Sequence, residues 1–306
     1  GVPKDVLHVV NGDKEAVDAI LHDARVQAVS FVGSTPIAEY IYRTGTSNDK
    51  RVQALGGAKN HMIVMPDADV SHVRDALIGS AFGSAGERCM AVSVAVCVGK
   101  ETADSVRDAV SEAAQKLNVG PYTDGDADFG PLSSEIHMNK VVSYIDKGVA
   151  EGADLVVDGR NLNLQGYEKG YFVGPTVFDR VTSDMTIYKE EIFGPVLGIV
   201  RCSSYSDAVS LVDNHELGNG AALFTNDGGV SRHFVEKTQI GMVGVNVPIP
   251  VPVAYHSFGG WKRSLFGDHH MHGPEGIRFY TKLKSATIAW PAGANTGPEF
   301  SIPVLS

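Results

Sequence analysis

The sequence has 306 residues, of which 43% are hydrophobic and 20% charged, and its formal net charge is −10. These values are typical of a folded globular protein, and the negative charge argues against nucleic acid or an anionic membrane as the main partner. No apolar run approaches the roughly 20 residues that span a bilayer, and the opening residues show no signal-peptide pattern. Three cysteines are too few for a disulfide framework. We therefore expect a reducing compartment, the cytoplasm or, in a eukaryote, the mitochondrial matrix.

Apolar runs of strand length alternate with amphipathic stretches along the chain. We predict strands at residues 6–10, 28–32, 51–55, 61–65, 92–98, 155–157, 176–178, 196–200, 221–224 and 242–245. Between them we predict helices at 14–22, 36–43, 69–82, 102–117, 135–150, 206–214 and 230–238. The proline-rich run 247–252 is read as an extended connector, and the tail 292–306 as irregular. This alternation predicts an α/β fold with mostly parallel sheets.

Cys89 is the first candidate for chemistry. It follows a glycine-bearing turn and precedes an apolar strand, and Arg88 stands directly before it. An adjacent guanidinium and free backbone N–H groups favour the thiolate, which is the nucleophilic form. The alternative is a buried structural thiol, the commoner fate of cysteine. Cys97, inside an apolar strand, and Cys202, at the end of another, fit that alternative better.

Three further patterns are weaker. At Gly33-Ser34 a predicted strand runs into a helix start, which would suit a phosphate, although on these residues alone a plain strand-to-helix turn is favoured. Glu191 and Phe193 precede a Gly-Pro turn, so they could hold a sugar hydroxyl and flank a planar ring, or form a charged loop. The run His269-His270-Met271-His272 lacks further ligands at suitable spacing, so no metal site is expected.

Six segments, taken in order, resemble motifs of the aldehyde dehydrogenase superfamily: residues 7–12, 31–35, 55–59, 86–89, 191–196 and 257–260. The resemblance implies that Cys89 is the nucleophile. It further implies that Gly33 and Ser34 lie near the NAD pyrophosphate, Glu191 on the nicotinamide ribose and Phe193 beside the nicotinamide. A partial Rossmann-type NAD domain (1–56), an α/β catalytic domain (57–262) and a C-terminal segment (263–306) are the implied organisation. Residues 281–290 resemble an assembly strand, which implies a homo-oligomer, a dimer or tetramer.

Within the superfamily, segments 58–68, 244–252 and 273–282 resemble the CoA-acylating, methylmalonate-semialdehyde dehydrogenase branch. Hydrolytic members carry a Glu before Leu-Gly-Gly that activates water, whereas Ala54 stands there and cannot act as a base. The resemblance therefore implies NAD as oxidant and CoA as acyl acceptor, with propionyl-CoA or acetyl-CoA as product. It also assigns Arg88 to the substrate carboxylate, because a guanidinium binds carboxylate bidentately.

Three alternatives stay open at this point. Glu87 could replace the missing base in a hydrolytic enzyme, or it could form an ion pair with Arg88. The chain could also be a non-catalytic fragment, because it covers about the C-terminal three-fifths of the family pattern. The sequence departs from the family pattern in two ways. Ala38 stands where the family usually has glycine, and the N-terminal portion of the pattern, which supplies an Asn for the oxyanion hole, has no counterpart in these 306 residues. Removing such a donor costs roughly 10²–10³ in rate.

Overall fold

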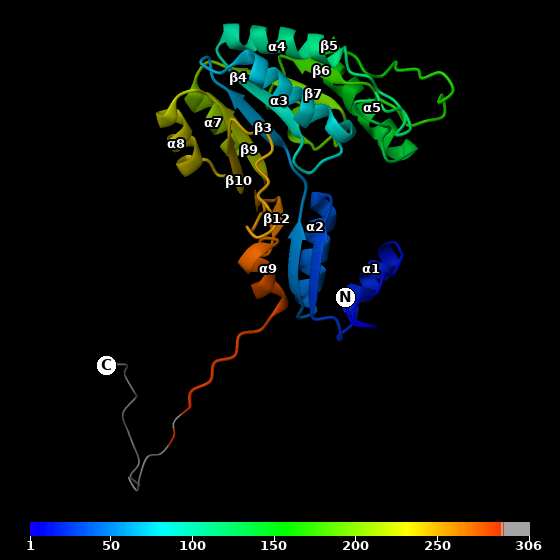
Figure 1. Ribbon diagram of the computed structural model, residues 1–306, viewed down its shortest axis with the longest axis vertical. Coiled ribbons are helices and arrows are strands. Elements are labelled where there is room, and N and C mark those ends of the chain that lie inside the picture. Colours follow the sequence, from blue (N-terminus) through cyan, green and yellow to red (C-terminus); the bar gives the residue numbers. More distant parts are fainter. Residues whose placement is uncertain (289, 291–306) are drawn as a thin grey trace.

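The computed structural model describes residues 1–288 and 290, and its elements form two lobes (Figure 1). The small lobe holds a three-stranded sheet in the order β1-β2-β12, in which β1 and β2 are parallel and β12 runs antiparallel to β2. Its elements are α1 (Lys14–His22), β1 (Ala28–Val32), α2 (Thr35–Ser47), β2 (Arg51–Leu55), β12 (Leu265–Phe266) and α9 (Gly273–Tyr280). A small core of Leu21, Ala38, Ile41, Val52 and Ala54 joins α1 and α2 to β2.

The large lobe holds a seven-stranded sheet in the order β10-β9-β3-β4-β7-β6-β5, parallel except for β5. The strands are β3 (Asn60–Val64), β4 (Val92–Val98), β5 (Asp154–Val157), β6 (Thr176–Asp179), β7 (Val196–Cys202), β9 (Gly220–Phe224) and β10 (Met242–Val245). The helices are α3 (Val70–Phe82), α4 (Lys100–Ala114), α5 (Glu135–Ala150), α6 (Thr186–Lys189), α7 (Tyr205–Asn214) and α8 (Gly228–Lys237). Every residue of β3 and β9 is buried, so both faces of the sheet are covered, as is typical of parallel sheets.

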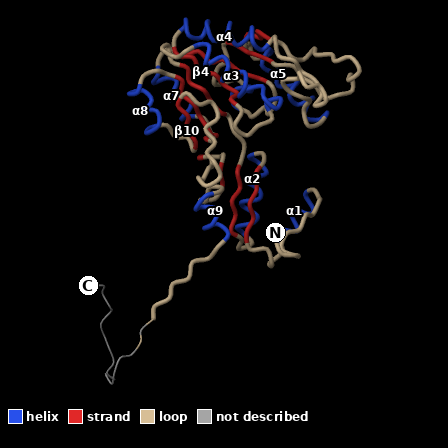
Figure 2. Tube along the Cα trace, in the orientation of Figure 1, coloured by secondary structure: helices blue, strands red, loops and turns tan. Residues whose placement is uncertain are grey.

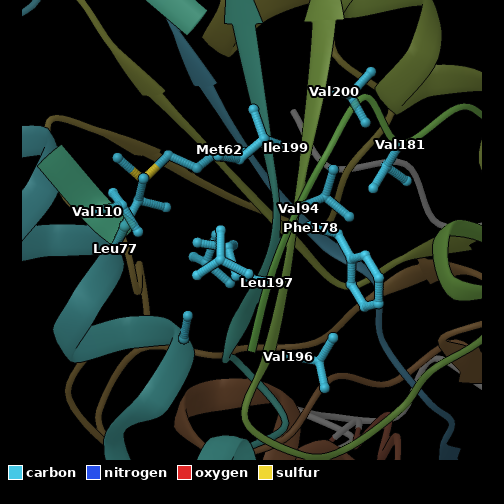
Figure 3. Packing of buried hydrophobic residues seen from close by; sticks show 14 of the residues in the cluster. Met62, Leu77, Val94, Val110, Phe178, Val181, Val196, Leu197, Ile199 and Val200 are labelled. Atoms are coloured by element: carbon cyan, nitrogen blue, oxygen red, sulfur yellow. The ribbon is translucent and has the colours of Figure 1, made fainter. Parts of the chain in front are cut away.

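The main core lies on the large sheet. Met62 of β3, Leu197 of β7 and Phe178 of β6 are fully buried, and Leu77 of α3 and Val110 of α4 belong to the same cluster (Figure 3). Burying a side chain of this size contributes about 1.5–3 kcal/mol. The centre of the sheet is therefore a rigid platform for the loops at its edge.

The main chain passes between the lobes twice within the described residues: through 56–59, from β2 to β3, and through 246–264, from β10 to β12. On the second passage β11 (Trp261–Lys262) pairs with β8 (Leu217–Gly218). The Ser264 hydroxyl donates to Gly57 O at 2.7 Å and accepts from Gly218 N at 3.1 Å. One side chain thus bonds both passages, and the candidate site lies beside this junction.

Most predicted elements are confirmed, and α1, β1, β2, β4, α5 and β10 have the predicted bounds. The predicted α/β class is correct. The predicted strand 6–10 is wrong: its residues are irregular, and Val6, Leu7, Val9 and Val10 are exposed. A strand requires a neighbour for its backbone groups, and no described strand pairs with this segment. Residues 281–288 form no strand and lead away from both lobes (Figure 2); the predicted irregular tail 292–306 lies outside the described residues.

Two other features of the described residues bear on function. None of their helices has the length and apolar character needed to cross a membrane. No group of three or more His, Cys, Asp or Glu side chains among them is arranged to hold a metal ion. His269 of the histidine-rich run is instead 2.8 Å from the Glu275 carboxylate.

Candidate active site

The loop that carries Cys89 has an unusual backbone. After α3 the chain makes a 3-10 turn, Gly83–Gly86, in which Ser84, Ala85 and Gly86 have φ of 56°, 55° and 70°. Left-handed conformations cost of order 1–3 kcal/mol at non-glycine residues and cluster at functional sites. A Cβ on Gly86 would lie 2.2 Å from Gly194 O, so this position requires glycine. The turn ends with Cys89 exposed.

Two asparagines hold the backbone of the thiol residue. The carbonyl of Cys89 accepts from Nδ2 of Asn60 at 3.0 Å and from Nδ2 of Asn219 at 3.1 Å. Asn60, which is buried, also donates to Ala91 O at 3.0 Å and accepts from Gly220 N at 3.0 Å. Neither asparagine is among the site residues predicted from the sequence. The available signal was a polar residue at the start of the buried, apolar strand β3.

A cleft at this point brings together four of the residues predicted from the sequence. Cys89, Arg88, Glu191 and Phe193 all line it, as do Ala58 and Asn60, among others. Gly33 and Ser34 do not line it. They lie at the β1–α2 turn of the small lobe, and the next residue, Thr35, accepts a hydrogen bond from Gly57 N at 2.9 Å.

Glu191 reaches this junction from the segment between α6 and β7. Its Oε1 accepts from Ala58 N at 3.0 Å, and a Cβ on Gly57 would lie 2.4 Å from its Oε2. Burial raises the pKa of the Glu191 carboxyl, and the hydrogen bond from Ala58 and the charge of Lys59 oppose that rise. Oε2 accepts no hydrogen bond from the described residues, so it is free to receive a hydroxyl group. This arrangement fits the sugar hydroxyl that the resemblance predicts.

The start of α2 fits a phosphate group. Ser34 is the N-cap residue but makes no side-chain capping bond, and Pro occupies the first turn. Backbone N–H groups in the first turn of a helix lack intrahelical partners and attract anions. In this turn Pro36 has no N–H and Ile37 N donates to Ser34 O at 3.0 Å, so the donors left for an anion are the N–H groups of Ser34 and Thr35, and Ser34 is exposed.

Arg88 is available to a ligand. Its guanidinium lies against Gly83 and donates to Ser84 Oγ at 3.2 Å and to Gly79 O at 3.3 Å. Within the part of the chain that the structure describes, no carboxylate lies within ion-pair distance of it. The alternative ion pair with Glu87 is therefore wrong: Glu87 accepts from the Ser133 hydroxyl at 2.9 Å instead.

The other two cysteines have a different environment. Cys97 is fully buried in β4, and burial raises its pKa to about 12. Burial also raises the pKa of Cys202. Both thiols are therefore protonated near neutral pH, as expected for structural cysteines. Ala54, which the resemblance places where hydrolytic relatives have a water-activating Glu, is fully buried in the small core with Ala38.

Comparisons with known proteins agree with this arrangement. A model of the aldehyde dehydrogenase family matches residues 1–286. Malonate-semialdehyde dehydrogenase of Pseudomonas aeruginosa is 57% identical over 306 residues, which are 100% of this chain and 62% of that protein. The enzyme of the same name from Halalkalibacterium halodurans is 47% identical over 290 residues, 95% of this chain and 59% of that protein.

Solved structures are similar as well. Methylmalonate-semialdehyde dehydrogenase from Oceanimonas doudoroffii is 59% identical, with a TM-score of 0.94 over 96% of this chain and 60% of that chain. Mycobacterium tuberculosis aldehyde dehydrogenase complexed with NAD⁺ is 30% identical, with a TM-score of 0.85 over 91% of this chain and 56% of that one. The chain thus spans about 60% of the length of its relatives. By sequence and by structure, the chain belongs to the aldehyde dehydrogenase family.

Proposed function

We propose that this chain carries the reactive thiol of an NAD-dependent, CoA-acylating oxidation of methylmalonate or malonate semialdehyde. The observation that carries the proposal is that Cys89, the one exposed cysteine, lines a cleft together with Arg88 and Glu191. The names of the relatives in Pseudomonas aeruginosa and Oceanimonas doudoroffii support this choice of substrate.

The chemistry begins at Cys89. Its thiolate attacks the aldehyde carbon and forms a thiohemiacetal, while the Arg88 guanidinium binds the substrate carboxylate through charge-assisted hydrogen bonds. Bound NAD supplies the acceptor for the hydride that leaves this carbon. The acyl group then remains on Cys89 as a thioester. Its β-carboxylate departs as CO₂, and the resulting enolate takes up a proton.

The acyl group leaves when the sulfur of CoA attacks the thioester carbonyl and the Cys89 thiolate departs. The products are propionyl-CoA from methylmalonate semialdehyde and acetyl-CoA from malonate semialdehyde. Three groups would hold NAD: Gly33 and Ser34 at the start of α2 for the pyrophosphate, Oε2 of Glu191 for the nicotinamide ribose, and the ring of Phe193 beside the nicotinamide. Each assignment rests on the resemblance together with the fit described above.

One observation favours a hydrolytic enzyme as second candidate. Glu191 lines the same cleft as Cys89, and a buried carboxylate with a raised pKa is suited to general-base work. The residue that serves as base in hydrolytic relatives is Ala54 here, and the Ala58 N–H occupies one oxygen of Glu191. Transfer to CoA is therefore the preferred reading.

The test measures NADH formation from methylmalonate semialdehyde and NAD, with and without CoA. Strong dependence on CoA is expected; equal turnover without CoA would favour the hydrolytic enzyme. Cys89→Ala should abolish turnover and Cys202→Ala should retain it. A chain that shows no saturable NAD binding in a fluorescence titration would be a non-catalytic fragment.

The proposal includes the setting of the enzyme. The division into residues 1–56, 57–262 and 263–306 is supported by the two sheets, and by β12, which returns to the small one. We place the protein in the cytoplasm, or the mitochondrial matrix of a eukaryote, because its three cysteines are free thiols. Residues 281–290 are proposed to mediate assembly into a homo-oligomer, which light scattering on the intact chain would detect.

A further inference from the structure

Four consecutive residues bond the start of α2, Glu191 and its loop, and the loop of Cys89. Gly57 N donates to Thr35 Oγ1 at 2.9 Å, and Ala58 N donates to Glu191 Oε1 at 3.0 Å. Lys59 and Asn60 follow and make the longer-range contacts that are described next. All four residues are buried. They comprise the last three residues of the passage from β2 to β3 and the first residue of β3, and we call them the 57–60 segment.

Lys59 points toward the loop that carries Glu191. Its Nζ donates to Ile187 O at 2.7 Å and to Glu190 O at 2.8 Å. These carbonyls belong to the second residue of α6 and to the residue directly before Glu191. A buried amino group that bonds two main-chain oxygens fixes the path of the backbone between them, because leaving either carbonyl unpaired would cost about 1–3 kcal/mol.

Asn60 points the other way, toward the thiol loop. Its amide bonds the carbonyls of Cys89 and Ala91 and the N–H of Gly220, so all three contacts are to main chain. These bonds cross from β3 to β9 and to the loop between α3 and β4. The loop contains three consecutive left-handed residues and needs such support to keep its conformation.

We propose that Lys59 and Asn60 are paired positioning residues, Lys59 for the loop of Glu191 and Asn60 for Cys89, and that their adjacency fixes the distance between the two loops. The inference rests on the proposed function for the roles of Cys89 and Glu191. Neighbouring residues of an extended chain point to opposite sides, so one peptide unit can hold two loops in register. An error of about 1 Å between reacting groups costs of the order of 10²-fold in rate.

The first test uses Asn60→Asp, which keeps the shape of the side chain but replaces two N–H donors by a carboxylate facing carbonyl oxygens. Iodoacetamide is the probe, and peptide mapping identifies alkylated Cys89. We expect the alkylation rate at pH 7 to fall by about 3-fold or more and the pH midpoint of alkylation to move upward, because negative charge disfavours a nearby thiolate. Hydrogen exchange of residues 187–193 should be unchanged.

The second test uses Lys59→Met. Hydrogen exchange of the amides in 187–193 should accelerate by about 10-fold or more, because two buried carbonyls lose their donor. Alkylation of Cys89 should keep its wild-type rate and pH midpoint. In turnover assays this variant should raise the KM for NAD, whereas Asn60→Asp should lower kcat.

The chain offers one control for each variant, a buried lysine for Lys59 and an exposed asparagine with main-chain hydrogen bonds for Asn60. Lys50 is a buried lysine that donates to two main-chain carbonyls, Asp23 O at 2.6 Å and Val26 O at 2.8 Å. Asn246 donates to Thr225 O and accepts from Thr225 N, each at 3.0 Å. Lys50→Met and Asn246→Asp should change neither the alkylation nor the exchange of 187–193.

The proposal is overturned if both variants disturb both loops equally, or if neither variant differs from its control. Should a variant fail to fold, Asn60→Ser and Lys59→Gln, each of which keeps one donor, are measured instead. Asn60→Ser should slow alkylation without moving its pH midpoint, because it adds no charge, and Lys59→Gln should accelerate the exchange of 187–193 less than Lys59→Met does. Alkylation and exchange require no turnover. A wild-type chain that makes no NADH would therefore contradict the proposed function while these measurements still decide the positioning roles.

Discussion

Replacing Lys59 by Met should change how the stability of the protein depends on pH. Lys59 is fully enclosed, and burial lowers its pKa from 10.5 to about 7, against the opposing charges of Glu191 and Glu190. Above pH 7 the folded state therefore holds Lys59 neutral, while the unfolded state keeps it protonated up to about pH 10. In this window the unfolded state binds more protons, so stability rises with pH.

The magnitude follows from the two pKa values. The unfolding free energy of the wild type relative to Lys59→Met should rise by about 1.4 kcal/mol per pH unit between roughly pH 7.5 and 9.5, or about 3 kcal/mol in total. Below pH 7 the lysine is charged in both states, and the difference should become constant.

Urea unfolding followed by circular dichroism at pH 6, 7.5, 8.5 and 9.5 measures the difference. Lys59→Gln is the matched control: it is also uncharged but keeps a donor, so it should differ from Lys59→Met by a constant at all pH values. A difference between wild type and Lys59→Met that is flat or falls with pH would show that Lys59 keeps its charge in the folded state.

Three further substitutions test other parts of the structure. Arg88→Gln should raise the KM for the carboxylated semialdehyde by about 10–100-fold, because it removes a hydrogen bond between two charged groups. The KM for propionaldehyde, which has no carboxylate, should not change. Equal effects on both aldehydes in steady-state kinetics would argue against carboxylate binding. Gly86→Ala should lower the melting temperature by several degrees, since its Cβ would meet Gly194 O at 2.2 Å, whereas Gly79→Ala, with open space around it, should not. Asp179→Ala should cost about 1–3 kcal/mol in denaturant unfolding, because buried Asp179 pairs with Arg201 at 2.6 Å while Asp104, at 2.8 Å, remains as a second partner of Arg201. No measurable cost would contradict this.

Local signals were sufficient to predict much of the large lobe. Residues 135–150 show helical periodicity, and Ser134 caps the helix by accepting from His137 N at 3.2 Å. The strand 92–98 is a continuous apolar run, as expected for a strand buried on both faces. Where periodicity and capping agree, element type and bounds follow from the sequence.

The errors arose where structure depends on a distant neighbour. Residues 6–10 have a strand-like composition, but no described strand receives their backbone groups. Strands β8, β11 and β12 have two residues each, too few to show a period. Helix α9 was missed because it begins with Gly-Pro, a pair typical of turns.

The residues of the candidate site fall into the same two groups, those with a local signal in the sequence and those that depend on a distant neighbour. The sequence around Cys89 was sufficient to predict it as a reactive residue. The composition around Glu191 favoured a charged loop, and only the family resemblance predicted a binding role for that residue. Asn60 and Asn219 could not be assigned, because they meet Cys89 across 29 and 130 residues of sequence. Their convergence depends on how β3, β4 and β9 pair, which local patterns do not specify.

The double connection between the lobes has a mechanical consequence. Two lobes joined by a single chain passage, or tether, can rotate about any axis. Two tethers side by side leave one axis of easy rotation, the line that runs through both. The Ser264 hydroxyl, in the second tether, bonds Gly57 in the first tether and Gly218 of β8, so it links the two tethers to each other and to the large lobe. Rotation of one lobe about that line would separate the start of α2 from Glu191. Each such opening would admit or release a ligand that contacts both lobes.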